Sequence, residues 1–305
     1  MKHDKELILG GAQLGGSYGI TNASFSEKEA IKVIRHSINN GITTFDTAPS
    51  YNRSEYILGK AINSYGYSCK SKINIITKTP INIMHFHSVS DIHFYLRKSL
   101  DRSLEFLMTD SLYAILVHHI EDLKFSYGKH LWEFLKKMQI SGKVKKIGFS
   151  LYDISQDFKI IEELKPDIIQ VPINILNIDF LKEELIYIKN CIGCEIHARS
   201  IFLQGVLLQD VSWFTGFFQP MRDWMNEIHL FCKKNSIEKY NLMLHIVKMA
   251  SFVDAIVVGI SDTHQLFHLL EVWEKQILVS HNIENELPKY NGPRELIDPR
   301  MWRKL

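Results

Sequence analysis

The sequence has few cysteines and no long apolar run. Four cysteines in 305 residues are too few for a disulfide-built fold. No apolar run approaches the roughly 18 residues that a membrane-spanning helix needs. The charged first residues lead into a short apolar segment without the apolar core of a secretion signal. We therefore expect a cytoplasmic protein with no membrane contact.

The sequence also lacks a surplus of charge of either sign. Its 36 lysines and arginines nearly cancel its 34 aspartates and glutamates, leaving a formal net charge of +2, and no block of basic residues stands out. Proteins that bind nucleic acids concentrate basic side chains to neutralise phosphates, so we expect no nucleic-acid partner. Cys191 and Cys194 have the spacing of a redox or zinc motif, but no second pair completes a four-ligand site. We therefore expect no bound metal.

Short runs rich in isoleucine and valine alternate with longer amphipathic segments. Most of the short runs lack strict alternation of apolar and polar residues, which is typical of strands buried on both faces. The predicted strands are Leu7–Gln13, Thr43–Thr47, Ile73–Thr79, Leu112–His118, Val144–Ser150, Asp167–Ile173, Cys194–Ser200 and Ala255–Ile260. The predicted helices include one that begins at a Ser26/Glu29 capping box, and the others are Ser54–Ile62, Ser90–Leu107, Leu131–Ile140, Ser155–Leu164, Leu181–Lys189, Met221–Lys234, Ile237–Met249 and His264–Gln276.

Strands that alternate with helices require parallel pairing and right-handed crossovers. Eight such units close most simply into a (β/α)8 barrel, and a doubly wound open sheet is the alternative. The sequence contains no internal repeat and no linker rich in proline and glycine. We therefore expect one barrel domain over residues 1–305, with an active-site insertion around residues 203–225 and a C-terminal tail over residues 284–305.

Ionisable residues follow several of the predicted strands. Asp46, Lys78 and His118 lie at strand ends, and Tyr51 follows Asp46 in the next loop. In a barrel these ends meet at one face, where the chemistry takes place. A lysine beside a tyrosine favours the phenolate, a buried aspartate keeps that lysine charged, and a histidine can orient a carbonyl group. Each residue alone could be a helix cap or a surface side chain. Together they predict a proton-transfer site that protonates an alkoxide as it forms.

Five segments resemble, in order, the strand-end motifs of the aldo-keto reductase superfamily. They are GITTFDTAPSY, IITKTP, YAILVHH, KVKKIGFS and IIQVPINIL, and the resemblance runs from about Leu7 to Leu270. It implies a (β/α)8 barrel that binds a nicotinamide cofactor without a Rossmann motif. It also implies that hydride passes to a carbonyl carbon while a tyrosine protonates the oxygen. The implied catalytic tetrad is Asp46, Tyr51, Lys78 and His118. His118 is preferred over His119 because the family pattern places the histidine directly after a Leu-x pair, and strand parity agrees with this choice.

The same resemblance implies a set of cofactor-binding residues. Arg199 stands where most members of the family carry an aromatic side chain that stacks on the nicotinamide. The loop after the last predicted strand offers no lysine or arginine for a 2′-phosphate, so NADPH is expected from the family and NADH is the alternative. The expected contacts are Ser150 and Gln170 at the carboxamide, Arg199 at the ring, Ser200, Phe202, Gln204 and Gly205 at the pyrophosphate, and Gly259, Ser261 and Gln265 at the adenosine half.

The glycine cluster GGAQLGGSYGI, residues 10–20, lacks the G-x-G-x-x-G order of a phosphate-binding loop. We interpret it as the end of the first strand and its loop, without a helix directly after it. There Gly10, Gly11 and Ala12 would let the backbone pass close to the nicotinamide. The residues expected to face the substrate are Tyr18, His119 and Trp213.

The leading hypothesis is an NAD(P)H-dependent oxidoreductase that reduces an aldehyde or ketone, with Tyr51 as general acid. RSIFLQGVLL and PRELIDPRMW resemble a bacterial subgroup associated with surface-polysaccharide pathways, which implies carbohydrate metabolism and a keto-sugar or nucleotide-linked sugar as substrate. The alternatives are a non-catalytic NADP(H)-binding regulatory subunit, and a barrel lyase or epimerase with Lys78 as a Schiff base. We expect a monomer or a small homo-oligomer whose partner is a small carbonyl compound.

Overall fold

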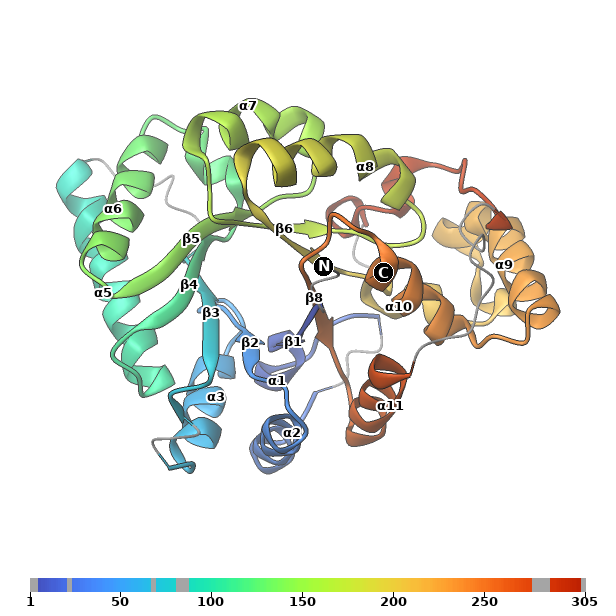
Figure 1. The fold of residues 1–305 in the computed structure, drawn as a ribbon, viewed down its shortest axis with the longest axis horizontal. Helices are drawn as coiled ribbons and strands as arrows, with labels where there is room; N and C mark the ends of the chain where they lie inside the picture. The colour runs from blue at the N-terminus through green and yellow to red at the C-terminus, as the bar shows by residue number, and fades with distance from the viewer. Residues whose placement is uncertain (1–4, 21–23, 67–69, 81–87, 276–285, 303–305) are drawn as a thin grey trace.

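The computed structural model describes residues 5–20, 24–66, 70–80, 88–275 and 286–302. Eight parallel strands close into a barrel in sequence order, which confirms the predicted (β/α)8 fold (Figure 1). The strands are β1 (Glu6–Gly10), β2 (Thr44–Asp46), β3 (Asn74–Lys78), β4 (Leu112–Val117), β5 (Val144–Ser150), β6 (Ile168–Pro172), β7 (Glu195–Arg199) and β8 (Ala255–Gly259). From β2 to β8, each observed strand lies within the predicted one.

The barrel has an inner and an outer apolar layer. Ile8, Ile76, Leu116, Ile168 and Val257 share one buried cluster with Ala114 and Ala255 and come from strands around the barrel. Side chains such as Leu9, Phe45 and Ile169 belong to a second, larger cluster that includes the surrounding helices. This burial on both faces explains why the strands read as nearly continuous apolar runs.

The helices form a ring around the strands (Figure 1). The predicted capping box is present: the Ser26 hydroxyl accepts from the Glu29 amide at 3.3 Å, and the Glu29 carboxylate accepts from the Ser26 amide at 3.0 Å. The α-helices are α1 (Ala12–Gly15), α2 (Glu27–Asn39), α3 (Ser54–Asn63), α5 (Val89–Leu107), α6 (Gly128–Ile140), α7 (Ile154–Leu164), α8 (Ile178–Tyr187), α9 (Arg222–Lys234), α10 (Lys239–Met249) and α11 (Thr263–Glu274).

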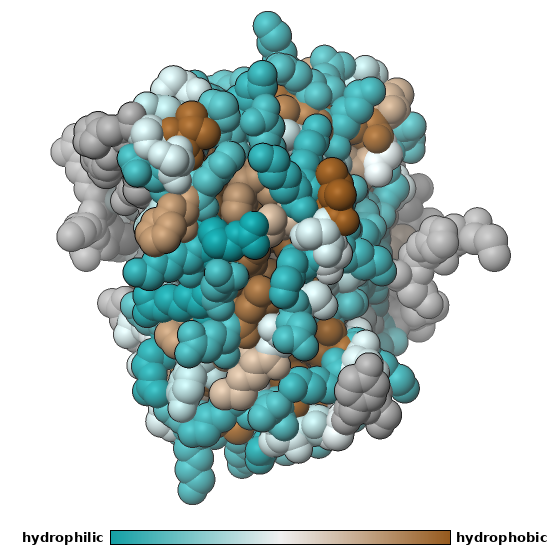
Figure 2. Space-filling model, turned by 90° about the vertical axis from the view of Figure 1, so that its left-hand side faces the viewer, coloured by the Kyte–Doolittle hydropathy of each residue, from teal (hydrophilic) through white to brown (hydrophobic). Residues whose placement is uncertain are grey.

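The surface of the molecule over α5 and α6 is mainly hydrophilic, with scattered hydrophobic side chains (Figure 2). Phe94 on α5 and Ile140 on α6 are exposed apolar residues. Single exposed apolar residues of this kind are normal for a folded domain. Within the described residues, no helix is long and apolar enough to cross a membrane.

The segment around residues 203–225 builds a core of its own. Three 3-10 turns, η4 (Leu203–Leu208), η5 (Val211–Trp213) and η6 (Gly216–Met221), lead into α9. Phe214, Phe218 and Trp224 are buried there together with Tyr290 of the C-terminal tail. The Trp224 indole N–H donates to the Pro288 carbonyl at 3.0 Å, which ties the tail to α9.

The first strand is shorter than predicted. We expected it to reach Gln13 with no helix directly after it, but β1 ends at Gly10 and Ala12–Gly15 form one helical turn. The Gly11 amide donates to the Asp46 carbonyl at 2.7 Å, and the Leu14 amide donates back to the Gly11 carbonyl at 3.1 Å. The turn buries Leu14 in the core, so tertiary contacts outweigh the low helix propensity of Gly15.

Gly59 provides a test of how closely the helices approach one another. In an exposed helix interior, glycine to alanine would gain about 1 kcal/mol. A Cβ on Gly59, however, would lie 2.1 Å from the Phe106 carbonyl oxygen and 2.8 Å from the backbone of Leu107. Overpacking costs about 1–3 kcal/mol, so Gly59→Ala should lower the thermal midpoint, by roughly 2–4 °C for each kcal/mol lost.

The matched control is Gly66→Ala, because a Cβ at Gly66 would meet no atom within 4 Å. Thermal unfolding followed by circular dichroism compares the two variants. A Gly59→Ala midpoint equal to or above that of Gly66→Ala would contradict this account of the α3–α5 contact.

Candidate active site

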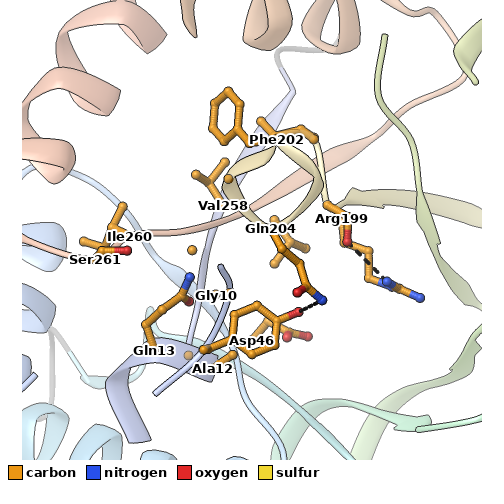
Figure 3. Close-up of a pocket in the computed structure, with 18 of the residues that line it drawn as sticks. Gly10, Ala12, Gln13, Asp46, Arg199, Phe202, Gln204, Val258, Ile260 and Ser261 are labelled. Carbon is orange, nitrogen blue, oxygen red and sulfur yellow. Dashed lines mark hydrogen bonds between the residues drawn. The ribbon is translucent and has the colours of Figure 1, made fainter. Parts of the chain in front are cut away.

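A cavity of about 480 Å³ opens at the carboxyl ends of the barrel strands. Figure 3 shows the cavity with Gly10, Ala12 and Gln13 on one wall and the loop after β7 on another. The lining residues are Gly10, Gly11, Ala12, Gln13, Tyr18, Gly19, Asp46, Tyr51, Lys78, His118, His119, Ser150, Tyr152, Gln170, Arg199, Ser200, Ile201, Phe202, Gln204, Gly205, Leu208, Gln209, Tyr240, Val257, Val258, Gly259, Ile260, Ser261 and Gln265.

A buried ion pair lies at the base of this cavity. Asp46 ends β2 and Lys78 ends β3, and both side chains are almost fully buried. The Lys78 ammonium donates to Asp46 Oδ1 at 2.7 Å and to the Thr47 carbonyl at 3.0 Å. The other carboxylate oxygen accepts from Gln170 Nε2 at 2.9 Å. Burial lowers the pKa of Lys78, but the Asp46 carboxylate and the Tyr51 hydroxyl outweigh it and raise the pKa above its ordinary value, so this lysine remains a cation.

Tyr51 lies beside this cation. The Lys78 ammonium nitrogen is 4.9 Å from the centroid of the Tyr51 ring. The Tyr51 amide donates to the Ala48 carbonyl, and the Ser54 amide donates to the Tyr51 carbonyl, both at 3.0 Å. A Cβ on Gly15 would lie only 1.8 Å from the Tyr51 carbonyl oxygen. Glycine at position 15 therefore lets the first loop pack directly against the turn that holds Tyr51.

Two stacked histidines complete this part of the cavity. The rings of His118 and His119 are stacked with centroids 4.8 Å apart, and the Tyr51 ring meets the His118 ring edge-on at 5.7 Å. The Ser50 hydroxyl lies 3.3 Å from His118 Nδ1. Burial, followed by the charges of Lys78, His119 and Arg199, lowers the pKa of His118 to about 2. His118 is therefore a neutral imidazole, which can donate one hydrogen bond without carrying charge.

The loop after β7 forms a wall with unusual backbone geometry. Ser200, Leu203 and Gln204 have φ values of +56°, +48° and +55°. Non-glycine residues in this region cost roughly 1–3 kcal/mol each and concentrate at functional sites. The Gln204 amide donates to the Tyr18 hydroxyl at 3.4 Å across the cavity. Burial, followed by Tyr51, raises the pKa of Tyr18 to about 12, so Tyr18 stays protonated.

The remaining walls fit a dinucleotide. A Cβ on Gly10 would come within 3.3 Å of the Gly259 amide nitrogen, and a Cβ on Gly259 would collide with the Gln13 side chain at 2.4 Å, so bare backbone forms this part of the wall. Phe202 and Tyr240 stack with centroids 4.5 Å apart and offer a flat aromatic surface. Aromatic and backbone surfaces of this kind suit a nucleotide ring.

The structure brings nearly all of the predicted site residues to this one cavity. Trp213, expected at the substrate pocket, does not line the cavity, because its ring packs against Phe214 and Phe218 in the second core. Sequence reasoning missed Tyr152 and Tyr240. Tyr152 lies two residues beyond β5, so a search of the residues after each predicted strand could have found it. Tyr240 belongs to α10, and no sequence pattern near it indicates a site residue.

Of the CxxC pair, Cys194 is buried and Cys191 exposed, and both are free thiols.

Comparison with known proteins gives consistent matches. The model of the Aldo/keto reductase family matches residues 6–284. Aldo-keto reductase YhdN of Bacillus subtilis (strain 168) is 30% identical over 189 residues, which cover 60% of this chain and 52% of that protein. D-arabinose 1-dehydrogenase of Saccharomyces cerevisiae is 29% identical over 150 residues, 48% of this chain and 43% of that protein. The chain thus spans about half the length of these curated relatives.

Solved structures share the fold at low identity. The holo form of aldo-keto reductase AKR11C1 from Bacillus halodurans has a TM-score of 0.74 at 19% identity and covers 94% of each chain. An aldo/keto reductase from Klebsiella pneumoniae in complex with NADP and acetate has a TM-score of 0.64 at 17% identity, covering 93% of this chain and 92% of that chain.

The lowered pKa of His118 gives a testable titration. Its ring should show no titration between pH 5 and 8 in nitrogen-detected NMR of the imidazoles, with the signal assigned by its loss in His118→Gln. Since the unfolded chain binds this proton near the ordinary value of 6.5, His118 contributes stability above about pH 6.5 that is lost as the pH falls. A His118 midpoint inside the pH 5–8 window would contradict the described environment.

Proposed function

Because this chain belongs to the aldo/keto reductase family, we propose that it is an NAD(P)H-dependent oxidoreductase that reduces an aldehyde or ketone to an alcohol. The observation that carries the proposal is the buried Lys78–Asp46 pair held against Tyr51 at the base of the cavity. This arrangement serves proton transfer and has no evident purpose in a packed core. When bound, a reduced nicotinamide supplies a hydride to the carbonyl carbon.

The proton side of the reaction belongs to Tyr51. Its hydroxyl gives a proton to the carbonyl oxygen as negative charge develops there. The Lys78 cation stabilises the phenolate left behind, because opposite charges a few ångströms apart favour the ionised form. Asp46 keeps Lys78 charged and in place, and in the reverse direction the same tyrosine acts as base. His118, as a neutral ring beside Tyr51, orients the carbonyl oxygen by a hydrogen bond.

We assign the nicotinamide end of the cofactor to the cavity wall near Gly10 and Ala12, with Ser150 at the carboxamide. Gln170 belongs to the same region, but its amide nitrogen already donates to Asp46, so it also holds the ion pair. The adenosine half would lie near Phe202 and Tyr240. The remaining proposed contacts are Gly11, Arg199, Ser200, Gln204, Gly205, Gly259, Ser261 and Gln265.

NADPH is the cofactor we propose, as in the NADP complex of the Klebsiella pneumoniae structure. The loop after β8 carries no lysine or arginine. The Ser261 amide donates to the Gln265 side chain at 2.9 Å, and Asp262 caps α11. NADH is therefore the alternative that a parallel titration must include.

For the substrate we propose a sugar-like carbonyl compound, since the cavity presents several hydroxyl and amide groups and one relative is named for D-arabinose.

Tyr51→Phe tests the mechanism directly. The variant removes only the hydroxyl, so turnover should fall by about 10²- to 10⁴-fold, the usual worth of a general acid, while cofactor binding changes little. The readouts are loss of absorbance at 340 nm with NADPH or NADH against a panel of aldehydes, ketones and keto-sugars, and cofactor titration by protein fluorescence.

Tyr56→Phe is the matched control, because Tyr56 lies nearby on α3, packs against Arg53 and Lys60, and does not line the cavity. If Tyr51→Phe retained most of the activity, the result would contradict the proposed mechanism. Tight cofactor binding without oxidation in the presence of any carbonyl would favour the regulatory-subunit alternative. Trapping of substrate on Lys78 by borohydride would favour the Schiff-base alternative.

A further inference from the structure

Three side chains from distant parts of the chain form a stack beside the cavity. Two guanidinium groups pack on the Tyr152 ring, with Arg199 Cζ 4.3 Å and Arg300 Cζ 3.9 Å from its centroid. Arg199 ends β7, Tyr152 follows β5, and Arg300 comes from η8 (Pro299–Met301) in the tail. Arg199 and Tyr152 line the cavity. The tail thus reaches the active-site face through this stack.

The two arginines differ in how their charge is balanced. Arg300 pairs with Asp298 at 2.6 Å and with Glu121 at 3.3 Å. Arg199 takes part in none of the ion pairs found among residues 5–20, 24–66, 70–80, 88–275 and 286–302. Its Nη2 donates to the Leu151 carbonyl at 3.2 Å and its Nη1 to the Ser200 hydroxyl at 3.3 Å. Both acceptors are neutral, so the positive charge of Arg199 is not cancelled.

Arg199 also has an unsatisfied donor. Its Nε is buried and has no hydrogen-bond partner in the described structure. A buried donor without a partner and a cation without a counter-charge are both costly. Because Arg199 lines the cavity, a ligand bound there can balance its charge. The guanidinium is held in a fixed position before any ligand binds, by its hydrogen bond to the Leu151 carbonyl and by its contact with the Tyr152 ring.

Among the charged groups that line the cavity, Arg199 is the one available to bind an anion. The Lys78 charge is already balanced by Asp46, and the adjacent His118 ring is neutral. The guanidinium fork matches the two oxygens of a carboxylate or a phosphate and forms short charge-assisted bonds with them. In Figure 3, Arg199 lies on the opposite side of the cavity from Ile260 and from Ser261, which is one of the proposed cofactor contacts.

We propose that Arg199, held by Tyr152 with Arg300 behind it, binds an anionic group of the substrate, a carboxylate or a phosphate, while the carbonyl of the same molecule meets Tyr51. This inference rests on the proposed carbonyl reduction and names its substrate class. In addition to the cofactor contact proposed above, Arg199 is then a specificity-determining residue, because it selects carbonyl compounds that carry negative charge.

The experiment compares substrates that differ only in that charge. One pair is 4-carboxybenzaldehyde and its methyl ester, and the other is glyceraldehyde 3-phosphate and glyceraldehyde. For the wild-type chain, kcat/KM should favour the anionic member of at least one pair by about 10-fold or more. The pair that shows the preference tells a carboxylate ligand from a phosphate ligand. Equal kcat/KM values within both pairs would overturn the proposal.

Variants then assign the preference to Arg199. Arg199→Gln should reduce the anionic-to-neutral ratio of kcat/KM by about 10- to 100-fold, and Arg199→Lys should retain part of it, because lysine keeps the charge but loses the fork. Arg294→Gln is the control, since Arg294 is an exposed arginine of the C-terminal tail and does not line the cavity. A ratio unchanged in Arg199→Gln would overturn the proposal. The same holds if only the NADPH dissociation constant rises, because the bound anion would then be a cofactor phosphate.

A binding measurement separates this inference from the proposed function. Calorimetry with 4-(hydroxymethyl)benzoate and with its methyl ester needs no turnover. Tighter binding of the acid by wild type, lost in Arg199→Gln, would support the anion site even if no carbonyl compound were reduced. Equal binding of acid and ester, together with reduction of neutral aldehydes, would overturn the anion site and leave the reductase standing.

Discussion

The site depends on one buried ion pair, Lys78 with Asp46. Both side chains are almost fully buried, and an unpaired charge would be costly there. The pair persists because the remaining bonding capacity is used: Lys78 also donates to Thr47, and Asp46 also accepts from Gln170. Three strands, β2, β3 and β6, therefore each contribute a side chain to this ion pair. Loss of either partner alone would leave a buried charge, at a cost of about 3–5 kcal/mol in stability.

The loops around the ion pair form the walls of the cavity. The glycine-rich segment after β1 presses against the Tyr51 turn through Gly15 and against the end of β2 through Gly11. On the opposite side, the loop after β7 takes left-handed conformations at Ser200, Leu203 and Gln204 and reaches Tyr18. The second core, built from residues 203–225, α9, α10, the loop after β6 and the tail, supports that loop, and the tail brings Arg300 to Tyr152. In the proposed mechanism, the barrel supplies the proton chemistry, and the segments outside the barrel shape what can approach it.

Much of this could be predicted from the sequence because parallel strands place their carboxyl ends at one face. Asp46, Lys78 and His118 follow from that rule, and the Ser26–Glu29 cap follows from local hydrogen bonding. The sequence could not reveal contacts that join distant segments. Trp213 was expected in the cavity because it follows β7, yet it packs into the second core. The α1 turn, the Tyr240 wall and the Arg199–Tyr152–Arg300 stack all depend on tertiary packing that no local pattern encodes.

In the proposed mechanism, Lys78 and Asp46 act on Tyr51 as a single unit. The most direct test is a double-mutant cycle on the single-turnover rate of cofactor oxidation, using Asp46→Asn, Lys78→Met and the double variant. If the pair is one unit, the double variant should be no slower than the slower single variant, because removing one partner already disables the other. Rate losses that multiply in the double variant would show that the two residues act independently and would contradict the account.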